Sequence, residues 1–177
     1  MILYVVRHGE TEKNKYGLIQ GQTECDLSEN GINKAKELIS LVKDIDIDVV
    51  ISSPLRRAID TAKIITDNRF PINIDDRIIE RDWGLCEGAS IDDVDTVKCW
   101  NFTLNTDANG IEKVQDLLKR VSEFLEDIKV RYSNSNVLVV SHSAILRAIH
   151  YCLHPIPEDG DMSKIDIPNL RIIEYEI

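Results

Sequence analysis

The most informative stretch of this sequence reads Ile2-Leu3-Tyr4-Val5-Val6-Arg7-His8-Gly9-Glu10-Thr11. Its first half is apolar and rich in β-branched residues, which predicts a buried strand. Such a strand would place Arg7, His8 and Gly9 in the turn that follows it. A neutral imidazole can attack phosphorus, a guanidinium can bind two phosphate oxygens, and a glycine lets the backbone approach a ligand closely. This combination suits covalent phosphoryl chemistry.

Helix and strand patterns alternate along the rest of the chain. We expect further strands at residues 48–52, 71–74, 137–140 and 170–177. We expect a polar loop at residues 12–26. One helix should follow Ser28 as its N-cap, and a second should follow Ser53 as its N-cap, with Pro54 in the first turn. Two further helices are expected, one over residues 111–128 and one from Ser143 to Pro155. Such alternation predicts an α/β fold with three α/β/α layers and a mostly parallel central sheet.

Composition narrows the classes of protein and partner. The 177 residues suit one domain over residues 1–177, and 43% hydrophobic with 29% charged residues is ordinary for a globular protein. A net charge of −10 argues against nucleic acid, because its phosphate backbone would be repelled. The same charge would repel a phosphorylated metabolite, so a phosphate site would have to be a local basic pocket in an acidic surface.

Features of membrane and secreted proteins do not occur in the sequence. No apolar run reaches membrane-spanning length, and no basic segment, apolar stretch and cleavage site follow Met1 in series. The four cysteines are scattered without a CxxC pair, which predicts reduced thiols. We therefore expect a cytoplasmic protein with no membrane partner, and its oligomeric state stays open.

Three of the predicted strands end in residues that suit phosphate binding. The first ends in Arg7 and His8, the second precedes a helix with Arg57 in its first turns, and the third leads to His142 at a helix start. Ligands of parallel sheets bind at the carboxyl ends of the strands, where helix N-termini also point. We therefore expect these two histidines and two arginines to meet over one phosphate.

Several motifs occur in order across nearly the whole chain. They are Arg7-His8-Gly9-Glu10-Thr11 with Asn14, Gln20-Gly21 before Asp26-Leu27-Ser28, Ser53-Pro54-Leu55-Arg56-Arg57-Ala58, and Val140-Ser141-His142. Together they resemble the histidine phosphatase superfamily, in its phosphoglycerate-mutase-like branch and compact phosphatase type. The resemblance implies a phosphoglycerate-mutase-like fold and a phosphoric monoester hydrolase that needs no metal or other cofactor and acts on a small phosphorylated metabolite.

The resemblance also implies a role for each catalytic residue. His8 would be the nucleophile that forms a phosphohistidine, which water then hydrolyses. Arg7, Arg57 and His142 would neutralise the phosphoryl oxygens in the transition state and keep His8 unprotonated. Glu80 matches the position of the general acid, which protonates the leaving alkoxide and then activates water.

Four further residues are expected to bind the substrate. Asn14, Gln20 and Gly21 would line the pocket. Ser143 stands where the family usually has glycine; its backbone N–H at a helix start can donate to phosphate, and its side chain either adds a contact or crowds the pocket. Glu87 is the alternative general acid, which we otherwise interpret as a structural residue.

Other polar and aromatic residues have two interpretations each. Glu112 either corresponds to a glutamate of the family or caps the long helix, and we do not expect it to be catalytic. His150 and His154 have the spacing of a metal pair, but no acidic or cysteine partner is evident, so we expect no metal there. The segment 98–110, with Trp100, is either a lid over the substrate or part of the core.

Two alternatives to a phosphatase stay open. A phosphoglycerate mutase would return the phosphoryl group from the same pocket, and Arg81 after Glu80 resembles the mutase pattern. Such mutases usually have an inserted basic segment, whereas residues 92–110 contain only one basic residue, Lys98, so hydrolysis is favoured. The second alternative is a binding or regulatory module of the same fold that has lost activity, which Ser143 keeps open. The substrate could be a sugar phosphate, a phosphoglycerate or α-ribazole phosphate.

Overall fold

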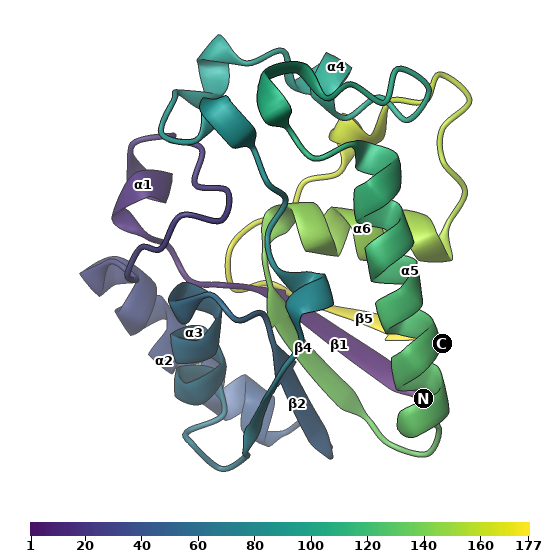
Figure 1. The fold of residues 1–177 in the computed structure, drawn as a ribbon. Coiled ribbons are helices and arrows are strands. Elements are labelled where there is room, and N and C mark those ends of the chain that lie inside the picture. The colour runs from purple at the N-terminus through teal and green to yellow at the C-terminus, as the bar shows by residue number, and fades with distance from the viewer.

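The computed structural model describes residues 1–177 and contains one five-stranded sheet in the order β3-β2-β4-β1-β5. The strands are β1 (Ile2–Arg7), β2 (Val49–Ser52), β3 (Ile72–Ile74), β4 (Val137–Ser141) and β5 (Ile172–Glu176). The helices are α1 (Glu12–Lys15), α2 (Glu29–Lys43), α3 (Arg56–Ile65), α4 (Thr96–Cys99), α5 (Val114–Arg131) and α6 (Ser143–Leu153). Only β5 is antiparallel to its neighbour. Helices α5 and α6 cover one face of the sheet and α2 and α3 the other (Figure 1), which confirms the predicted fold.

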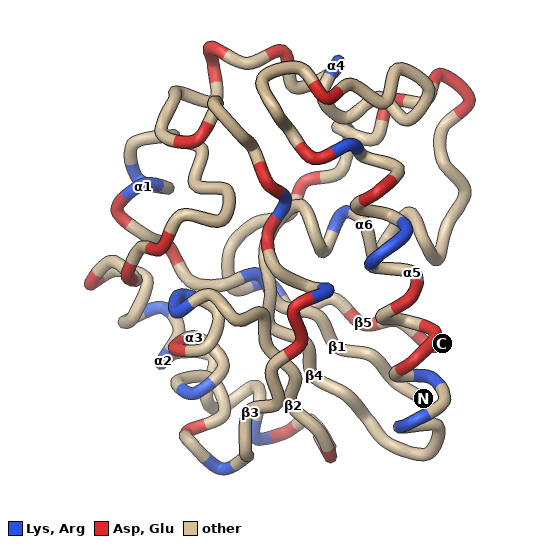
Figure 2. Tube along the Cα trace, viewed as in Figure 1, with Lys and Arg blue, Asp and Glu red and all other residues tan.

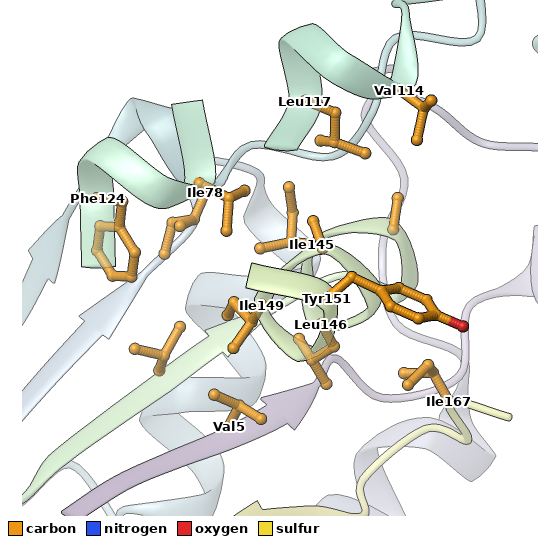
Figure 3. Packing of buried hydrophobic residues seen from close by; sticks show 14 of the residues in the cluster. Val5, Ile78, Val114, Leu117, Phe124, Ile145, Leu146, Ile149, Tyr151 and Ile167 are labelled. Carbon is orange, nitrogen blue, oxygen red and sulfur yellow. The ribbon is translucent and has the colours of Figure 1, made fainter. Parts of the chain in front are cut away.

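The central strands β1 and β4 are buried on both faces, so their successive side chains enter two different cores. Val5 and Val139 pack against α5 and α6, whereas Val6 and Val140 pack against α2 and α3. None of the four side chains is exposed. Figure 3 shows the first core, where apolar residues of α5 and α6 meet above β1. Packing from both sides holds the ends of these strands in place.

Strand register brings the predicted site residues together. Arg7 is paired with Ser141 at the ends of β1 and β4, and the end of β2 lies beside Val140. The residues that follow these strands leave the sheet at one edge. As a result, the ring centroids of His8 and His142 are 5.1 Å apart although the residues are far apart in sequence.

The helix caps confirm one prediction and contradict another. The Ser28 hydroxyl accepts a hydrogen bond from a backbone N–H in the first turn of α2, as an N-cap should. The predicted cap at Ser53 is wrong, because α3 begins only at Arg56 and has no side-chain cap. The Ser53 hydroxyl instead lies 2.7 Å from Nε2 of His142.

Three other elements differ in extent from the prediction. The expected loop at residues 12–26 contains the short helix α1, which the side chain of Thr11 caps. Helix α5 begins at Val114 rather than at residue 111, because a 3-10 turn precedes it. Strand β5 begins at Ile172, since Leu170 has a left-handed backbone conformation with a φ of 60°.

Charge is distributed over the whole molecule. Figure 2 shows Lys and Arg scattered along the chain among the more numerous acidic residues, which total 31 against 21. None of the helices has both the length and the apolar character needed to cross a bilayer. All four cysteines are free thiols.

Candidate active site

A cavity of about 390 Å³ lies where β1 ends and α6 begins. Eight of the nine residues that the sequence predicts for the site line this cavity: Arg7, His8, Asn14, Gln20, Gly21, Arg57, Glu80 and Ser143. They come from six different segments of the chain, including β1, α1, α3 and α6. The ninth, His142, lies outside the cavity lining.

The geometry around His8 leaves one ring nitrogen free. Nδ1 of this nearly buried ring lies 2.7 Å from the carbonyl oxygen of Gly9, an acceptor, so Nδ1 carries the proton and Nε2 keeps its lone pair. Burial, together with Arg57 and Arg7, holds the pKa of His8 well below its usual range. Nε2 is therefore suited to act as a nucleophile at neutral pH.

His142 packs edge-on against His8 and is fully buried. Its bond to the Ser53 hydroxyl fixes the ring, and burial, followed by the neighbouring His8, lowers the pKa of His142 well below its usual range. Its other nitrogen, Nδ1, has no partner in the protein. The structure thus places His142 behind the cavity wall rather than in it, with Nδ1 as the one atom left to bind a ligand.

Four buried side-chain nitrogen atoms in the molecule lack a hydrogen-bond partner, and all belong to residues at or directly behind this cavity. They are Nε of Arg7, Arg57 and Arg147 and Nδ1 of His142. Buried donors in native proteins are nearly always paired, because an unpaired one costs about 1–3 kcal/mol. Their concentration at one place indicates a binding site for an anion that accepts several hydrogen bonds.

Backbone carbonyl groups hold the two arginines that the sequence predicts. Arg57 is fully buried and donates to the carbonyl oxygens of Gly21 at 2.7 Å and Thr23 at 2.9 Å. Arg7 donates to the carbonyl oxygen of Ile167 at 2.7 Å. The arginine ion pairs of the protein lie elsewhere, so neither positive charge is neutralised by a carboxylate. Both remain available to an anionic ligand.

Glu80 is a buried carboxyl group in the cavity wall. One of its carboxylate oxygens accepts a hydrogen bond from the backbone N–H of Arg81 at 2.8 Å. Burial raises the pKa of Glu80, although Arg57 and Arg7 act in the opposite direction. A raised pKa keeps a proton on the carboxyl group nearer to neutral pH, as a general acid requires.

Glu87 holds the loop that carries Gly21 and does not line the cavity. Its carboxylate accepts hydrogen bonds from the backbone N–H groups of Gln22 and Thr23 and from the Thr23 hydroxyl. Gly21 has a φ of 51°, and a Cβ there would lie 1.8 Å from Oε1 of Glu87. These contacts favour the structural interpretation of Glu87.

We expect Gly21→Ala to lower the free energy of unfolding by about 1–3 kcal/mol, because the added Cβ meets Glu87 at a left-handed φ. The variant should also lose activity, since the Gly21 carbonyl positions Arg57. Urea denaturation measures the first effect. Gly88→Ala is the matched control, because Gly88 also has a positive φ but a Cβ added there would meet no other atom within 4 Å. An equal loss of stability in both variants would contradict the role of the clash.

Asn14 and Gln20 both line the cavity. Oδ1 of Asn14 accepts a hydrogen bond from the Thr11 N–H, and Oε1 of Gln20 accepts one from the Thr11 hydroxyl. No protein group accepts from either NH2 group, so both donors remain free for a ligand. Thr11 therefore orients two residues that the sequence predicts to bind substrate, one through its backbone N–H and one through its hydroxyl.

Ser143 is the first residue of α6 and lines the cavity together with Ala144. The N-cap side chain, that of His142, makes no capping hydrogen bond to this helix. The first N–H groups of α6 are thus without a side-chain cap at the cavity, and the helix dipole adds partial positive charge there. The serine side chain is half-buried at the wall, where its hydroxyl can contact a ligand.

Sequence reasoning missed Arg147, which lines the cavity from α6. It stands four residues after Ser143 and so on the same helix face, a spacing that could have signalled it. Its guanidinium stacks at 4.7 Å on the ring of Trp100 and donates to the carbonyl oxygen of Met162. Trp100 is itself 5% exposed, so part of the segment 98–110 belongs both to the core and to the cavity wall.

Glu112 and Arg81 support the site without lining it. The carboxylate of Glu112 binds Arg120 at 2.7 Å, and Lys113, not Glu112, is the N-cap of α5. The Glu112 carbonyl and the Cys99 carbonyl accept hydrogen bonds from the fully buried Arg81. These contacts anchor the segment that presents Glu80.

His150 and His154 lie on the far end of α6, outside the cavity lining. Their rings are stacked with centroids 4.2 Å apart, and Nδ1 of His150 lies 3.3 Å from the Tyr175 hydroxyl. No third His, Cys, Asp or Glu side chain joins them in an arrangement that could hold a metal ion.

Comparison with known proteins identifies the family. A model of the histidine phosphatase superfamily (branch 1) matches residues 3–177. The chain belongs to this superfamily. This histidine phosphatase is 36% identical over 169 residues to phosphoserine phosphatase 1 of Hydrogenobacter thermophilus, which covers 92% of the chain and 78% of the relative. It is 32% identical over 184 residues to the adenosylcobalamin/alpha-ribazole phosphatase of Salmonella typhimurium. This match covers 94% of the chain and 91% of the relative.

Solved structures agree with this assignment. A phosphoserine phosphatase variant from Entamoeba histolytica, in complex with phosphoserine, superimposes on the histidine phosphatase with a TM-score of 0.85 and 27% identity, over 98% of this chain and 89% of that one. Proteins named as phosphoglycerate mutases are also similar in sequence. The predicted family and the predicted class of enzyme, a phosphoric monoester hydrolase, are confirmed.

Proposed function

We propose that this enzyme hydrolyses small phosphomonoesters through a phosphohistidine on His8, with Glu80 as general acid and base. The observation that carries the proposal is the group of unpartnered nitrogen atoms beside the free Nε2 of His8. Relatives support a small phosphorylated substrate, since one acts on phosphoserine by name and another on α-ribazole phosphate. The substrate of this chain is accordingly a metabolite rather than a macromolecule.

The first half-reaction transfers the phosphoryl group to the protein. Nε2 of His8 attacks phosphorus while the bond from phosphorus to the ester oxygen breaks. Glu80 gives its proton to the leaving alkoxide, which departs as a neutral alcohol. Arg7, Arg57 and His142, with the N-terminus of α6, stabilise the charge on the phosphoryl oxygens.

The second half-reaction releases phosphate. Glu80 is now a carboxylate and takes a proton from water, whose oxygen attacks the phosphorus of the phosphohistidine. The bond between phosphorus and Nε2 of His8 breaks, and the ring returns to its neutral form. The hydrogen bond from Nδ1 of His8 to the Gly9 carbonyl keeps the same ring orientation through both steps.

The cavity favours hydrolysis over a mutase reaction. Lys98, the only basic residue of segment 92–110, is exposed and does not line the cavity. Arg81, which resembles the mutase pattern, is fully engaged by backbone carbonyls and does not line it either. No basic segment therefore covers the site to shield the phosphohistidine from water. The inactive binding module is the less favoured alternative, because Arg7, His8, Arg57 and Glu80 all line the same cavity as Ser143.

We expect the purified protein to hydrolyse p-nitrophenyl phosphate at an undiminished rate in the presence of EDTA. The protein's own cations supply the charge stabilisation in this mechanism, so chelation should have no effect. Release of p-nitrophenolate measures the rate, and a coupled assay measures phosphoglycerate mutase activity in parallel. Activity that EDTA abolishes and added metal restores would contradict the mechanism. A mutase rate well above the rate of hydrolysis would support the alternative.

A further inference from the structure

We propose that Arg147 binds a carboxylate of the substrate, so that the preferred substrates are small phosphomonoesters that also carry a carboxylate. This inference rests on the proposed function and assigns a substrate class to the same cavity. Arg147 would determine specificity, while Arg7 and Arg57 bind the phosphoryl group.

Arg147 has the hydrogen-bonding capacity that such a ligand needs. It lines the cavity, its Nη1 donates to the carbonyl oxygen of Met162, and its Nε is buried without a partner. No hydrogen bond to the protein involves its Nη2, and no carboxylate pairs with it. Nε and Nη2 form one edge of the guanidinium, which matches the two oxygens of a carboxylate.

A second arginine on the same tryptophan shows that this free edge is not a general property of arginines in this core. Arg81 also stacks on Trp100, again at 4.7 Å. Its Nε and Nη2 both donate to the carbonyl oxygen of Glu112, and its Nη1 donates to that of Cys99. Arg81 is therefore satisfied by the fold, whereas Arg147 keeps one edge for a ligand.

The position of Arg147 separates it from the phosphate-binding groups. It lies four residues along α6 from Ser143, which corresponds to about 6 Å along the helix axis. A carbon chain of two or three atoms bridges such a distance between a phosphoryl group and a carboxylate. The buried carboxyl group of Glu80 and the ring of Trp100 also line the cavity and would disfavour a second dianion. A planar monoanion fits this place better than a second phosphate.

The first test compares wild-type kcat/KM for substrate pairs that differ only by the carboxylate. O-phosphoserine is compared with O-phosphoethanolamine, and 3-phosphoglycerate with glycerol 3-phosphate. We expect a preference of about 10- to 100-fold for the carboxylate in each pair, mainly in KM, because the contact is a charge-assisted hydrogen bond. Equal values within each pair would overturn the inference.

The second test uses variants of Arg147. Arg147→Met should reduce the preference for the carboxylate to within about threefold. Arg147→Lys should retain part of this preference, because lysine keeps the positive charge but lacks the two adjacent N–H donors of the guanidinium. Arg56→Met is the matched control, since Arg56 is an exposed arginine that pairs with Asp26 outside the cavity. A preference that survives in Arg147→Met would overturn the inference. If thermal denaturation shows that Arg147→Met does not fold, the inference is tested by the carboxylate preference of Arg147→Lys and of the wild type.

Failure of the inference can be told apart from failure of the proposed function. Hydrolysis of p-nitrophenyl phosphate without any preference for carboxylates would count against Arg147 alone. Absence of all hydrolysis would count against the proposed function. Binding of 3-phosphoglycerate and glycerol 3-phosphate to His8→Ala, measured by calorimetry, then tests Arg147 without turnover. In His8→Ala we expect 3-phosphoglycerate to bind with a Kd about 10- to 100-fold lower than that of glycerol 3-phosphate, because one charge-assisted hydrogen bond contributes free energy of this order.

Discussion

His8→Ala is expected to lower kcat by about 10⁴-fold or more, because the variant has no atom that can form the covalent intermediate. The effect should be equally severe for p-nitrophenyl phosphate and for alkyl phosphates, since every substrate would pass through the same phosphohistidine. The hydrolysis rate of purified wild type and variant measures the loss. Substrate binding should persist, because Arg7, Arg57 and Arg147 do not depend on this side chain for their protein contacts.

Two further observations make the His8→Ala experiment specific. His150→Ala is the matched control, because His150 lies on α6 outside the cavity lining, and this variant should hydrolyse substrate like the wild type. When wild-type turnover is stopped rapidly without acid, phosphate should be found bound to the protein as the phosphohistidine. The same experiment on His8→Ala should find no protein-bound phosphate. Retained activity in His8→Ala would mean that another group, or water itself, attacks the phosphorus.

Glu80→Gln is expected to slow hydrolysis of esters with poor leaving groups by about 10²- to 10⁴-fold, because glutamine cannot give a proton to the departing alkoxide. The loss should be much smaller in the first half-reaction of p-nitrophenyl phosphate, whose leaving group is stable as an anion. Single-turnover rates for p-nitrophenyl phosphate and an alkyl phosphate measure this difference. With an alkyl phosphate, the wild-type rate should fall as pH rises through the raised pKa of Glu80, since the acid then loses its proton. This alkaline decline should be absent in Glu80→Gln.

The alternative acid provides the matched variant for this prediction. Glu87→Gln should show no dependence on the leaving group, because the Glu87 carboxylate holds Gln22 and Thr23 and does not line the cavity. Whatever activity it loses should be lost equally with both kinds of ester. A leaving-group dependence in Glu87→Gln and none in Glu80→Gln would reverse the two assignments.

The fold and the central part of the site could be predicted from the sequence because each depends on short, regular patterns. Apolar runs and helical spacing locate the strands and helices to within a few residues. Parallel strands have their carboxyl ends at one edge, so Arg7, His8 and Arg57 could be expected to meet before any distance was known. Glu80 has no such pattern around it, and only the resemblance to a family pointed to it.

The sequence by itself thus determined the order of the α/β elements and which candidate phosphate-binding residues stand at the strand ends, since these follow from local periodicity. Only the tertiary structure decided that Ser53 orients His142 instead of capping α3, that Glu87 holds a loop, and that Arg147 keeps a free edge in the cavity. The physical reason is that these roles depend on which side chains meet across irregular loops. Hydrogen-bond partners there are set by three-dimensional packing, which no sequence period encodes.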